Sequence, residues 1–166
     1  MTSLTPEQML AHFNVHAEAE FNGDIDTTMA TVADDPVFEW PCMDLQVVGR
    51  DAVREVYLRM FRGVIPKMLN GGRRMFGFGD NTLWGESIFG LEEEDGVVRK
   101  HSVLTVAKFE ADPIKIKGEY SYGSPGFLKL VRTALGNDIM DVPGVGPLDR
   151  ERATLIPVSY IGTGVD

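Results

Sequence analysis

The sequence has little cysteine and no long hydrophobic run. Cys42 is the one cysteine among 166 residues, so an intramolecular disulfide cannot form. This cysteine usage is typical of a reducing compartment, and we expect a cytoplasmic location. No apolar stretch approaches the ~20 residues that a transmembrane helix needs. Residues 1–7 have neither the basic nor the apolar segment of a signal peptide, so secretion is not expected.

Positive charge is also scarce, because 16 Lys and Arg residues face 25 Asp and Glu residues, for a net charge of −9. An acidic surface repels phosphate groups, so we expect neither a nucleic-acid nor a membrane partner. GxGxxG, Walker, GxSxG and CxxC motifs are all missing, and we expect no cofactor. His12, His16 and Glu20 share one helix face, but the outer two lie ~12 Å apart along the axis, so a metal site is not expected.

What is present indicates one soluble globular domain. Hydrophobic residues make up 43% and charged residues 25% of the chain, which is the usual balance of such proteins. A length of 166 residues fits a single domain. We assign residues 1–136 to this domain. Residues 137–166 are rich in Gly and Pro but also apolar, and we expect this tail to pack on the domain or on a partner subunit.

The first half of the chain has helical periodicity. Residues 5–8 form a capping box with Pro at the first helical position, and the helix that follows ends at Asn22-Gly23. A short second helix follows Asp24 and stops before Pro36. A third helix is predicted over residues 51–61, after two short strands. These strands are expected over residues 37–40 and 45–48.

The second half changes to the two-residue period of strands. Four strands are predicted, over residues 73–79, 82–92, 97–110 and 114–122. Asp95-Gly96 marks a hairpin turn, and Ser124-Pro125 begins a helix that ends at Leu135. Helices followed by a run of strands favour an α+β fold with an antiparallel sheet.

Several short motifs occur in a familiar order: Asn22-Gly23-Asp24, residues 33–39, Val48-Gly49-Arg50, residues 57–61 and Asp95-Gly96. Together they resemble the nuclear transport factor 2-like superfamily, especially its SnoaL-like and ketosteroid isomerase-like enzymes, over about residues 7–127. The resemblance implies a cone-shaped barrel, in which a curved antiparallel sheet encloses a deep apolar pocket. Three N-terminal helices would pack on the concave face, followed by a C-terminal helix and the extended tail. Many members move protons on hydrophobic rings without a cofactor, whereas others bind, transport or assemble.

The machinery of the steroid isomerases does not carry over. Trp40 stands at the position of their general-base aspartate, His16 at that of their oxyanion tyrosine, and Thr105 at that of their second acid. We therefore do not expect steroid isomerisation by that mechanism. The arginine and paired aspartates of the epoxide hydrolase branch are not evident either. A pocket rich in His and Tyr looks more like the scytalone dehydratase branch.

Strand alternation predicts which side chains face the pocket. If Thr105 faces inward, so do His101 and Val103. An ungapped match across the hairpin predicts that Trp84, Glu86 and Ile88 of the preceding strand also face inward. The expected substrate-binding residues are Phe38, Trp40, Tyr57, Trp84, Ile88, Val103 and Thr105. The expected catalytic residues are His101, His16, Glu86, Tyr120 and Tyr122. A register slip of one residue would turn Glu86 outward.

These side chains suggest general acid–base chemistry. Histidine titrates near neutral pH, Glu86 could orient it or accept a proton, and a tyrosine could hold a substrate oxygen. We predict a lyase or isomerase that performs elimination, isomerisation or cyclisation on an aromatic or polycyclic molecule. The alternative is a non-catalytic ligand-binding or assembly module, in which the histidines and tyrosines are structural. The opposite strand face carries Leu104 and Val106, which favours a homodimer.

Overall fold

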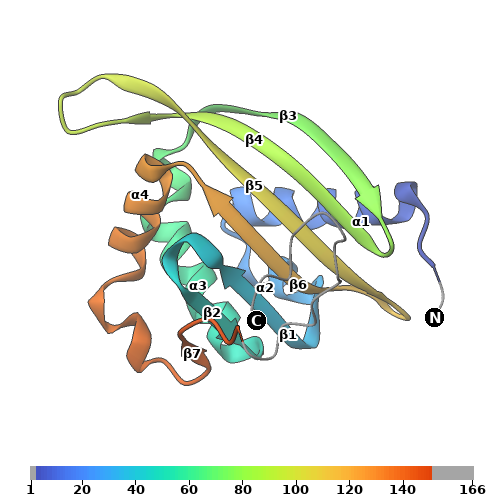
Figure 1. The fold of residues 1–166 in the computed structure, drawn as a ribbon. Helices are drawn as coiled ribbons and strands as arrows, with labels where there is room; N and C mark the ends of the chain where they lie inside the picture. Colours follow the sequence, from blue (N-terminus) through green and yellow to red (C-terminus); the bar gives the residue numbers. More distant parts are fainter. Residues whose placement is uncertain (1–2, 151–166) are drawn as a thin grey trace, which may run out of the picture.

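The computed structural model describes residues 3–150 and shows one strongly curved sheet with helices inside its curve (Figure 1). The helices are α1 (Pro6–Phe21), α2 (Ile25–Ala30), α3 (Arg50–Gly63) and α4 (Pro125–Leu135). The strands are β1 (Val32–Trp40), β2 (Leu45–Val48), β3 (Leu69–Gly79), β4 (Thr82–Glu92), β5 (Val98–Ala111), β6 (Ile114–Gly123) and β7 (Val145–Gly146). Three short 3₁₀ helices are η1 (Pro41–Met43), η2 (Ile65–Lys67) and η3 (Asn137–Asp141).

The strands form one sheet in the order β3-β4-β5-β6-β1-β2-β7. Neighbouring strands are antiparallel except for β1 and β6, which run parallel. The predicted α+β fold with a curved, mostly antiparallel sheet is confirmed. The second helix ends earlier than predicted, at Ala30, and β1 begins at Val32 because its first residues already pair with β6.

Local sequence explains where the helices begin and end. The Thr5 hydroxyl accepts from the Gln8 backbone N–H, and the Gln8 side chain accepts from the Thr5 N–H, so the predicted capping box is present. The Asp24 carboxylate caps α2 through the Thr27 N–H. Gly136 ends α4 with a φ of 77°, a conformation that glycine adopts without strain.

Arg50, at the start of α3, forms hydrogen bonds with both the end of α2 and the beginning of β1. Its guanidinium donates to the backbone carbonyls of Met29, Val32 and Ala33, at 2.6 to 3.0 Å. The Met29 carbonyl is near the end of α2, where the cation also complements the helix dipole, whereas the other two carbonyls belong to β1. This contact fixes α3 against the first strand.

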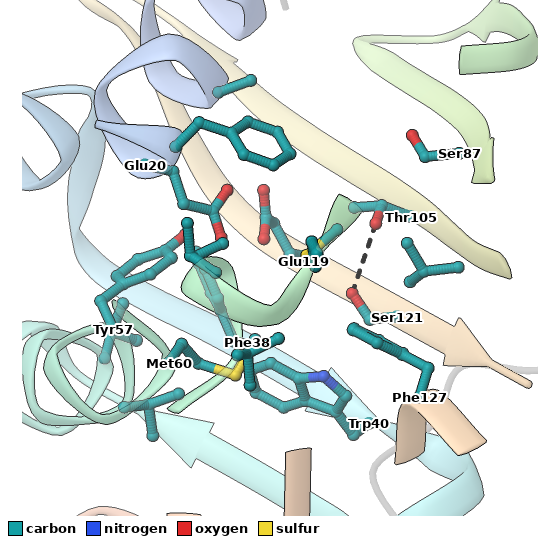
Figure 2. Close-up of a pocket in the computed structure, with 18 of the residues that line it drawn as sticks. Glu20, Phe38, Trp40, Tyr57, Met60, Ser87, Thr105, Glu119, Ser121 and Phe127 are labelled. Carbon is teal, nitrogen blue, oxygen red and sulfur yellow. Dashed lines mark hydrogen bonds between the residues drawn. The ribbon is translucent and has the colours of Figure 1, made fainter. Parts of the chain in front are cut away.

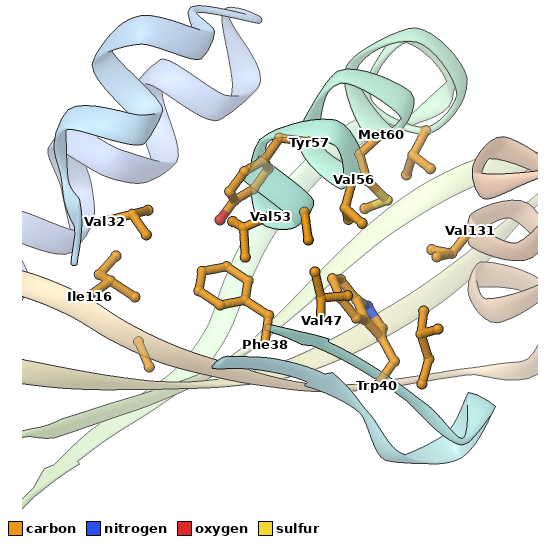
Figure 3. Packing of buried hydrophobic residues seen from close by; sticks show 14 of the residues in the cluster. Val32, Phe38, Trp40, Val47, Val53, Val56, Tyr57, Met60, Ile116 and Val131 are labelled. Atoms are coloured by element: carbon orange, nitrogen blue, oxygen red, sulfur yellow. The ribbon is translucent and has the colours of Figure 1, made fainter. Parts of the chain in front are cut away.

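The hydrophobic core lies between α3 and the strands β1 and β2 (Figure 3). Val53 and Val56 of α3 face Phe38 and Val47 of the sheet, and all four are almost completely buried. Burying a side chain of this size contributes about 2 kcal/mol. The Tyr57 ring packs edge-on against the Phe38 ring, with 5.8 Å between their centroids. The same contacts position the helix above the inner face of the sheet.

The chain beyond α4 packs on the domain as far as it is described. Strand β7 pairs with β2, with Val145 opposite Val47, and so extends the edge of the sheet. Packing of the whole tail, residues 137–166, on the domain or on a partner subunit stays a prediction, because residues 151–166 lie outside the described residues. Within residues 3–150, every helix is too short or too polar to cross a membrane.

Candidate functional site

A cavity opens between α1, α3 and the inner face of the sheet (Figure 2). Its volume is about 130 Å³. An apolar cavity of roughly 150 Å³ admits a benzene molecule, so this space matches a single aromatic ring. The wall is mainly apolar and includes Phe13, Phe38, Trp40, Val56, Met60 and Phe127.

Two carboxyl groups interrupt this apolar wall. Glu20 extends from α1 and Glu119 from β6, and Figure 2 shows the two groups pointing toward one another. The Glu119 side chain is only 12% exposed. Burial raises the pKa of Glu20 and, together with the nearby Glu20 charge, that of Glu119. Like charges at short range in an apolar site favour a pair that shares one proton.

A chain of hydrogen bonds lies behind this pair and fixes the tautomer of His16. The Thr31 hydroxyl donates its only hydrogen to the Thr28 carbonyl, at 2.6 Å. The His16 Nδ1, 2.7 Å from the Thr31 oxygen, must therefore carry the hydrogen of that bond. The His16 Nε2 is then an acceptor, and the Tyr57 hydroxyl, 2.9 Å away, donates to it. Burial lowers the pKa of His16 to about 4, so the ring is neutral at pH 7.

The neutral imidazole affects Glu119 directly. Glu119 Oε1 lies 3.5 Å from His16 Nε2, and an acceptor nitrogen beside it disfavours the ionised carboxylate. This effect acts in the same direction as burial and the nearby Glu20 charge, which both raise the Glu119 pKa. The Tyr57 pKa is raised well above its ordinary value by burial and by both carboxyl groups. Tyr57 is therefore an orienting group with its proton directed at His16.

Three hydroxyl groups complete the polar part of the cavity. Ser87, Thr105 and Ser121 come from the neighbouring strands β4, β5 and β6 and line its sheet side. Thr105 and Ser121 are opposite one another in the register, with their oxygens 3.5 Å apart (Figure 2). The cavity thus has hydroxyls on the sheet side and apolar side chains on the α3 side. Within residues 3–150, there is no cluster of three His, Cys, Asp or Glu side chains that could hold a metal ion.

Part of the predicted lining is found at the cavity. Phe38, Trp40, Tyr57, Val103 and Thr105 all contribute to its wall. They come from β1, α3 and β5.

The predicted orientation of the β4 residues is wrong. Trp84, Glu86 and Ile88 lie on the outer face, and the Arg74 Nε donates to Glu86 at 2.6 Å there. The last pair before the hairpin tip is Glu92 with Val98, so the loop spans residues 93–97. A loop with an odd number of residues pairs even positions with even positions, whereas an even-numbered loop reverses this. The ungapped match assumed the second case, which turned every β4 side chain to the wrong face.

The predicted orientation of Tyr120 and Tyr122 is also wrong. They pair with Val106 and Leu104 on the outer face, and Tyr122 is 41% exposed. A β-bulge near Lys117 shifts the β5–β6 register by one residue, because Phe109 pairs with Ile116 but Lys108 pairs with Gly118. Without that extra residue, Tyr120 would have stood opposite Thr105 and faced the cavity.

The two predicted histidines do not meet at the cavity. His16 is completely buried behind Tyr57 and does not line the cavity wall. His101 is on the inner face of β5, as predicted, but the start of α4 covers it. Its ring nitrogens lie 3.2 Å from the Ser124 hydroxyl and 3.1 Å from a Glu93 carboxylate oxygen. Neither histidine is therefore placed to touch a molecule in the cavity.

The acidic pair itself was not predicted from sequence. Glu119 follows Gly118, and a Cβ at Gly118 would lie 2.8 Å from the Val37 carbonyl oxygen. This close approach marks the bulge, and a strand glycine is the one signal that could have revealed it. Glu20 lies four residues after the buried His16 on the same helix face, which indicates a side chain directed inward.

Comparisons with known proteins bear on the fold. No protein-family model matches the sequence, and no curated protein matches it either. Among solved structures, an NTF2-like protein of unknown function from Cytophaga hutchinsonii is 18% identical, with a TM-score of 0.57 over 68% of this chain and 96% of that chain. An LEH-like epoxide hydrolase from M. tuberculosis is 18% identical, with a TM-score of 0.55 over 76% and 91%. PrhC from Penicillium brasilianum is 10% identical, with a TM-score of 0.57 over 78% and 88%.

Proposed function

We propose that this chain, which has the NTF2-like fold, is an enzyme that moves protons on an apolar ring compound with the Glu20–Glu119 pair. The observation that carries the proposal is the meeting of two carboxyl groups with raised pKa values in a ring-sized apolar cavity. Carboxyl groups tuned in this way act as general acids and bases near neutral pH. The epoxide hydrolase of similar fold is consistent with small-molecule chemistry in such a cavity.

The pair would act in its singly protonated form. The ionised carboxylate removes a proton from a carbon next to a carbonyl group. The electron pair of that C–H bond forms a C=C bond, and the π pair of the carbonyl moves onto its oxygen. The protonated carboxyl group gives its proton to this oxygen, which yields an enol. The enol then gives its O–H proton back to the ionised carboxylate as the C=O bond re-forms. The other carboxyl group gives its proton to another carbon, which completes an isomerisation, or to a leaving group expelled by the C=C electron pair, which completes an elimination. The pair ends with one proton, as it began.

The groups around the pair would orient it. His16 lies behind Glu119 and its acceptor nitrogen favours the protonated form of that carboxyl group, and the Tyr57 proton is directed at His16 rather than into the cavity. The hydroxyls of Thr105 and Ser121 line the sheet side, where they could donate to an oxygen of the substrate. Hydrogen-bond donors aimed at a developing oxyanion lower the barrier to enolisation.

Carbon–hydrogen exchange tests the proposal without knowledge of the natural substrate. The wild-type protein is incubated with phenylacetone, a single-ring ketone, in D₂O, and loss of the protons on the carbon between the ring and the carbonyl group is followed by ¹H NMR. We expect exchange above the buffer rate, and a reduction of at least about a hundredfold in Glu119→Gln and Glu20→Gln. The matched control is Glu18→Gln, which removes an exposed carboxylate from the same helix and should leave exchange unchanged.

The alternative is a binding module of the same fold. The predominantly apolar wall favours it, because such a wall binds a ring without any chemistry. Binding of ring compounds with no exchange in any of a panel of ring ketones would support this alternative. Equal exchange in the wild type and Glu119→Gln would overturn the assignment of the acidic pair.

A further inference from the structure

Arg73 is the one basic side chain among the described residues that line the cavity. It comes from β3 and stands opposite Ser87 of β4, so both side chains lie on the inner face of the sheet. Arg73 is exposed, unlike the acidic pair deeper inside. Its position therefore marks the open side of the cavity.

Two aromatic rings hold this guanidinium in place. The Arg73 Cζ lies 5.4 Å from the centre of the Phe13 ring, on α1, and 5.6 Å from that of the Phe76 ring, on β3. Cation–π contacts at this distance restrict the side chain while leaving its N–H groups available. The rings orient the charge but do not neutralise it.

In the described part of the chain, no carboxylate lies within 4.0 Å of Arg73. Some arginines are paired, such as Arg99 with Glu93 and Asp95, whereas others, such as Arg54, also lack a carboxylate within this distance among the described residues. Arg73 differs from the latter because it lines the cavity. A guanidinium has five N–H donors in a planar fork that matches a carboxylate. An unpaired arginine that is held in the wall of a cavity is suited to bind an anion from outside.

We infer that the substrate carries a carboxylate, which Arg73 binds at the mouth while the apolar ring enters the cavity. This inference rests on the proposed function in one respect, namely that the other end of the substrate reacts at Glu20 and Glu119. A monoanion fits better than a phosphate dianion, because the cavity wall supplies one positive charge. The Ser87 hydroxyl, opposite Arg73, is placed as a second donor to the same group.

The positions of Arg73 and Glu119 in the sheet predict an elongated substrate. Arg73 is on β3 and Glu119 is on β6, three strands further along the sheet. Adjacent strands are about 4.8 Å apart, so roughly 14 Å separates these two strands along the sheet, and the curvature makes the direct distance across the concave face shorter. The two side chains span part of that distance. The carboxylate is therefore separated from the reacting carbon by a ring or a short chain.

Isothermal titration calorimetry with matched ligands tests this inference. The ligands are 4-phenylbutyrate, 6-phenylhexanoate and 8-phenyloctanoate, each compared with its primary amide. We expect the best carboxylate to bind about tenfold more tightly than its amide, because charge-assisted bidentate bonds are stronger than neutral ones. Arg73→Gln should weaken carboxylate binding about tenfold and leave amide binding unchanged. Arg73→Lys should recover only part of the loss.

Arg74→Gln is the matched control. Arg74 is the next residue on β3, and it pairs with Glu86 on the outer face, so its loss changes the net charge equally without touching the cavity. We expect carboxylate binding by this variant to equal that of the wild type, with circular dichroism confirming that each variant is folded. Equal affinities for acids and amides, equal losses in both variants, or no binding by any carboxylate would overturn the inference.

The two proposals can fail separately. If ring ketones exchange in a Glu119-dependent manner but acids and amides bind alike, the carboxylate inference is wrong and the proposed chemistry stands. If carboxylates bind through Arg73 but Glu119→Gln leaves exchange unchanged, the binding inference stands and the acidic pair has no catalytic role.

Discussion

At the scale of single residues, the acidic pair is a costly feature that the surrounding structure maintains. A carboxylate loses its hydration when it is buried, and a second carboxyl group beside it adds repulsion. Glu20 and Glu119 escape part of this penalty by sharing a proton. The neutral His16 and the directed hydroxyl of Tyr57 keep that arrangement in place from the other side. The stability of the protein should therefore report on the ionisation of this pair.

We predict that the melting temperature of Glu119→Gln, relative to the wild type, rises as pH increases from 5 to 9. In the unfolded chain a glutamate titrates near 4.5, but in the folded protein the pKa of Glu119 is raised. The folded state thus binds more protons above pH 4.5, and its stability is lost as pH rises through the folded pKa. Glutamine does not ionise, so the variant escapes this loss. Each unit of pKa shift corresponds to about 3 °C for a protein of this size.

Differential scanning calorimetry across this pH range provides the measurement, with Glu18→Gln as the control whose difference from the wild type stays constant. The lowered pKa of His16 acts in the opposite sense, because its contribution to stability is lost as pH falls from 6.5 toward 4. Above about pH 7 His16 is neutral in both the folded and the unfolded state, so the difference from pH 7 to 9 contains no contribution from its titration. A difference that falls or stays flat up to pH 9 would contradict the raised pKa of Glu119.

At the scale of elements, a histidine and a glycine determine how α4 sits on the hairpin of β4 and β5. His101 bridges Ser124, just before α4, to Glu93 at the end of the hairpin. A Cβ at Gly126 would lie 2.1 Å from the His101 Cε1, so the ring occupies the space that any larger residue would need. The helix can approach the sheet only because this position is glycine.

Gly126→Ala should therefore destabilise the protein by about 1–3 kcal/mol, the usual cost of overpacking. The sign of this change in the free energy of unfolding is informative. Alanine is more favourable than glycine in an unconstrained helix by about 1 kcal/mol, so a loss of stability indicates the clash with His101. Urea unfolding measures the change. In the His101→Ala background the clash is gone, and adding Gly126→Ala should then be neutral or stabilising. A stabilising effect of Gly126→Ala in the wild-type background would show that α4 is not held by this contact.

Elements and their faces differ in how well the sequence predicts them. The limits of α4 follow from local chemistry, since Pro125 starts it and Gly136 ends it, and the prediction is confirmed. The faces of β4 and β6 depend on a five-residue hairpin loop and on a one-residue bulge. Either feature reverses the inward and outward sides of a whole strand without changing its periodicity. The sequence therefore does not predict that Glu119 faces the cavity, whereas it correctly predicts the inward orientation of Thr105, on the strand between these two features.

At the scale of the whole molecule, the outer face of the sheet carries partly exposed apolar side chains. Trp84 is 37% exposed and Tyr122 is 41% exposed, and they lie on that face with Leu104 and Val106 between them in the register. This face is partly apolar, although the Arg74–Glu86 ion pair also lies on it, and we expect it to be an interaction surface. A second copy of the same chain can cover it by a two-fold contact in which the same strands face each other.

We predict that the protein is a homodimer in solution and that Leu104→Glu makes it monomeric. A glutamate on this face would have to be buried beside its symmetry mate, which opposes association.

Each chain carries a net charge of −9, so dimers should form more readily at 500 mM NaCl than at 50 mM, as screening weakens the repulsion between copies. Light scattering coupled to size-exclusion chromatography measures both effects. Val15→Glu, which adds the same charge at an exposed position on α1, should leave the dimer intact. A wild-type protein that is monomeric at both salt concentrations would show that this apolar face is not covered by a second copy.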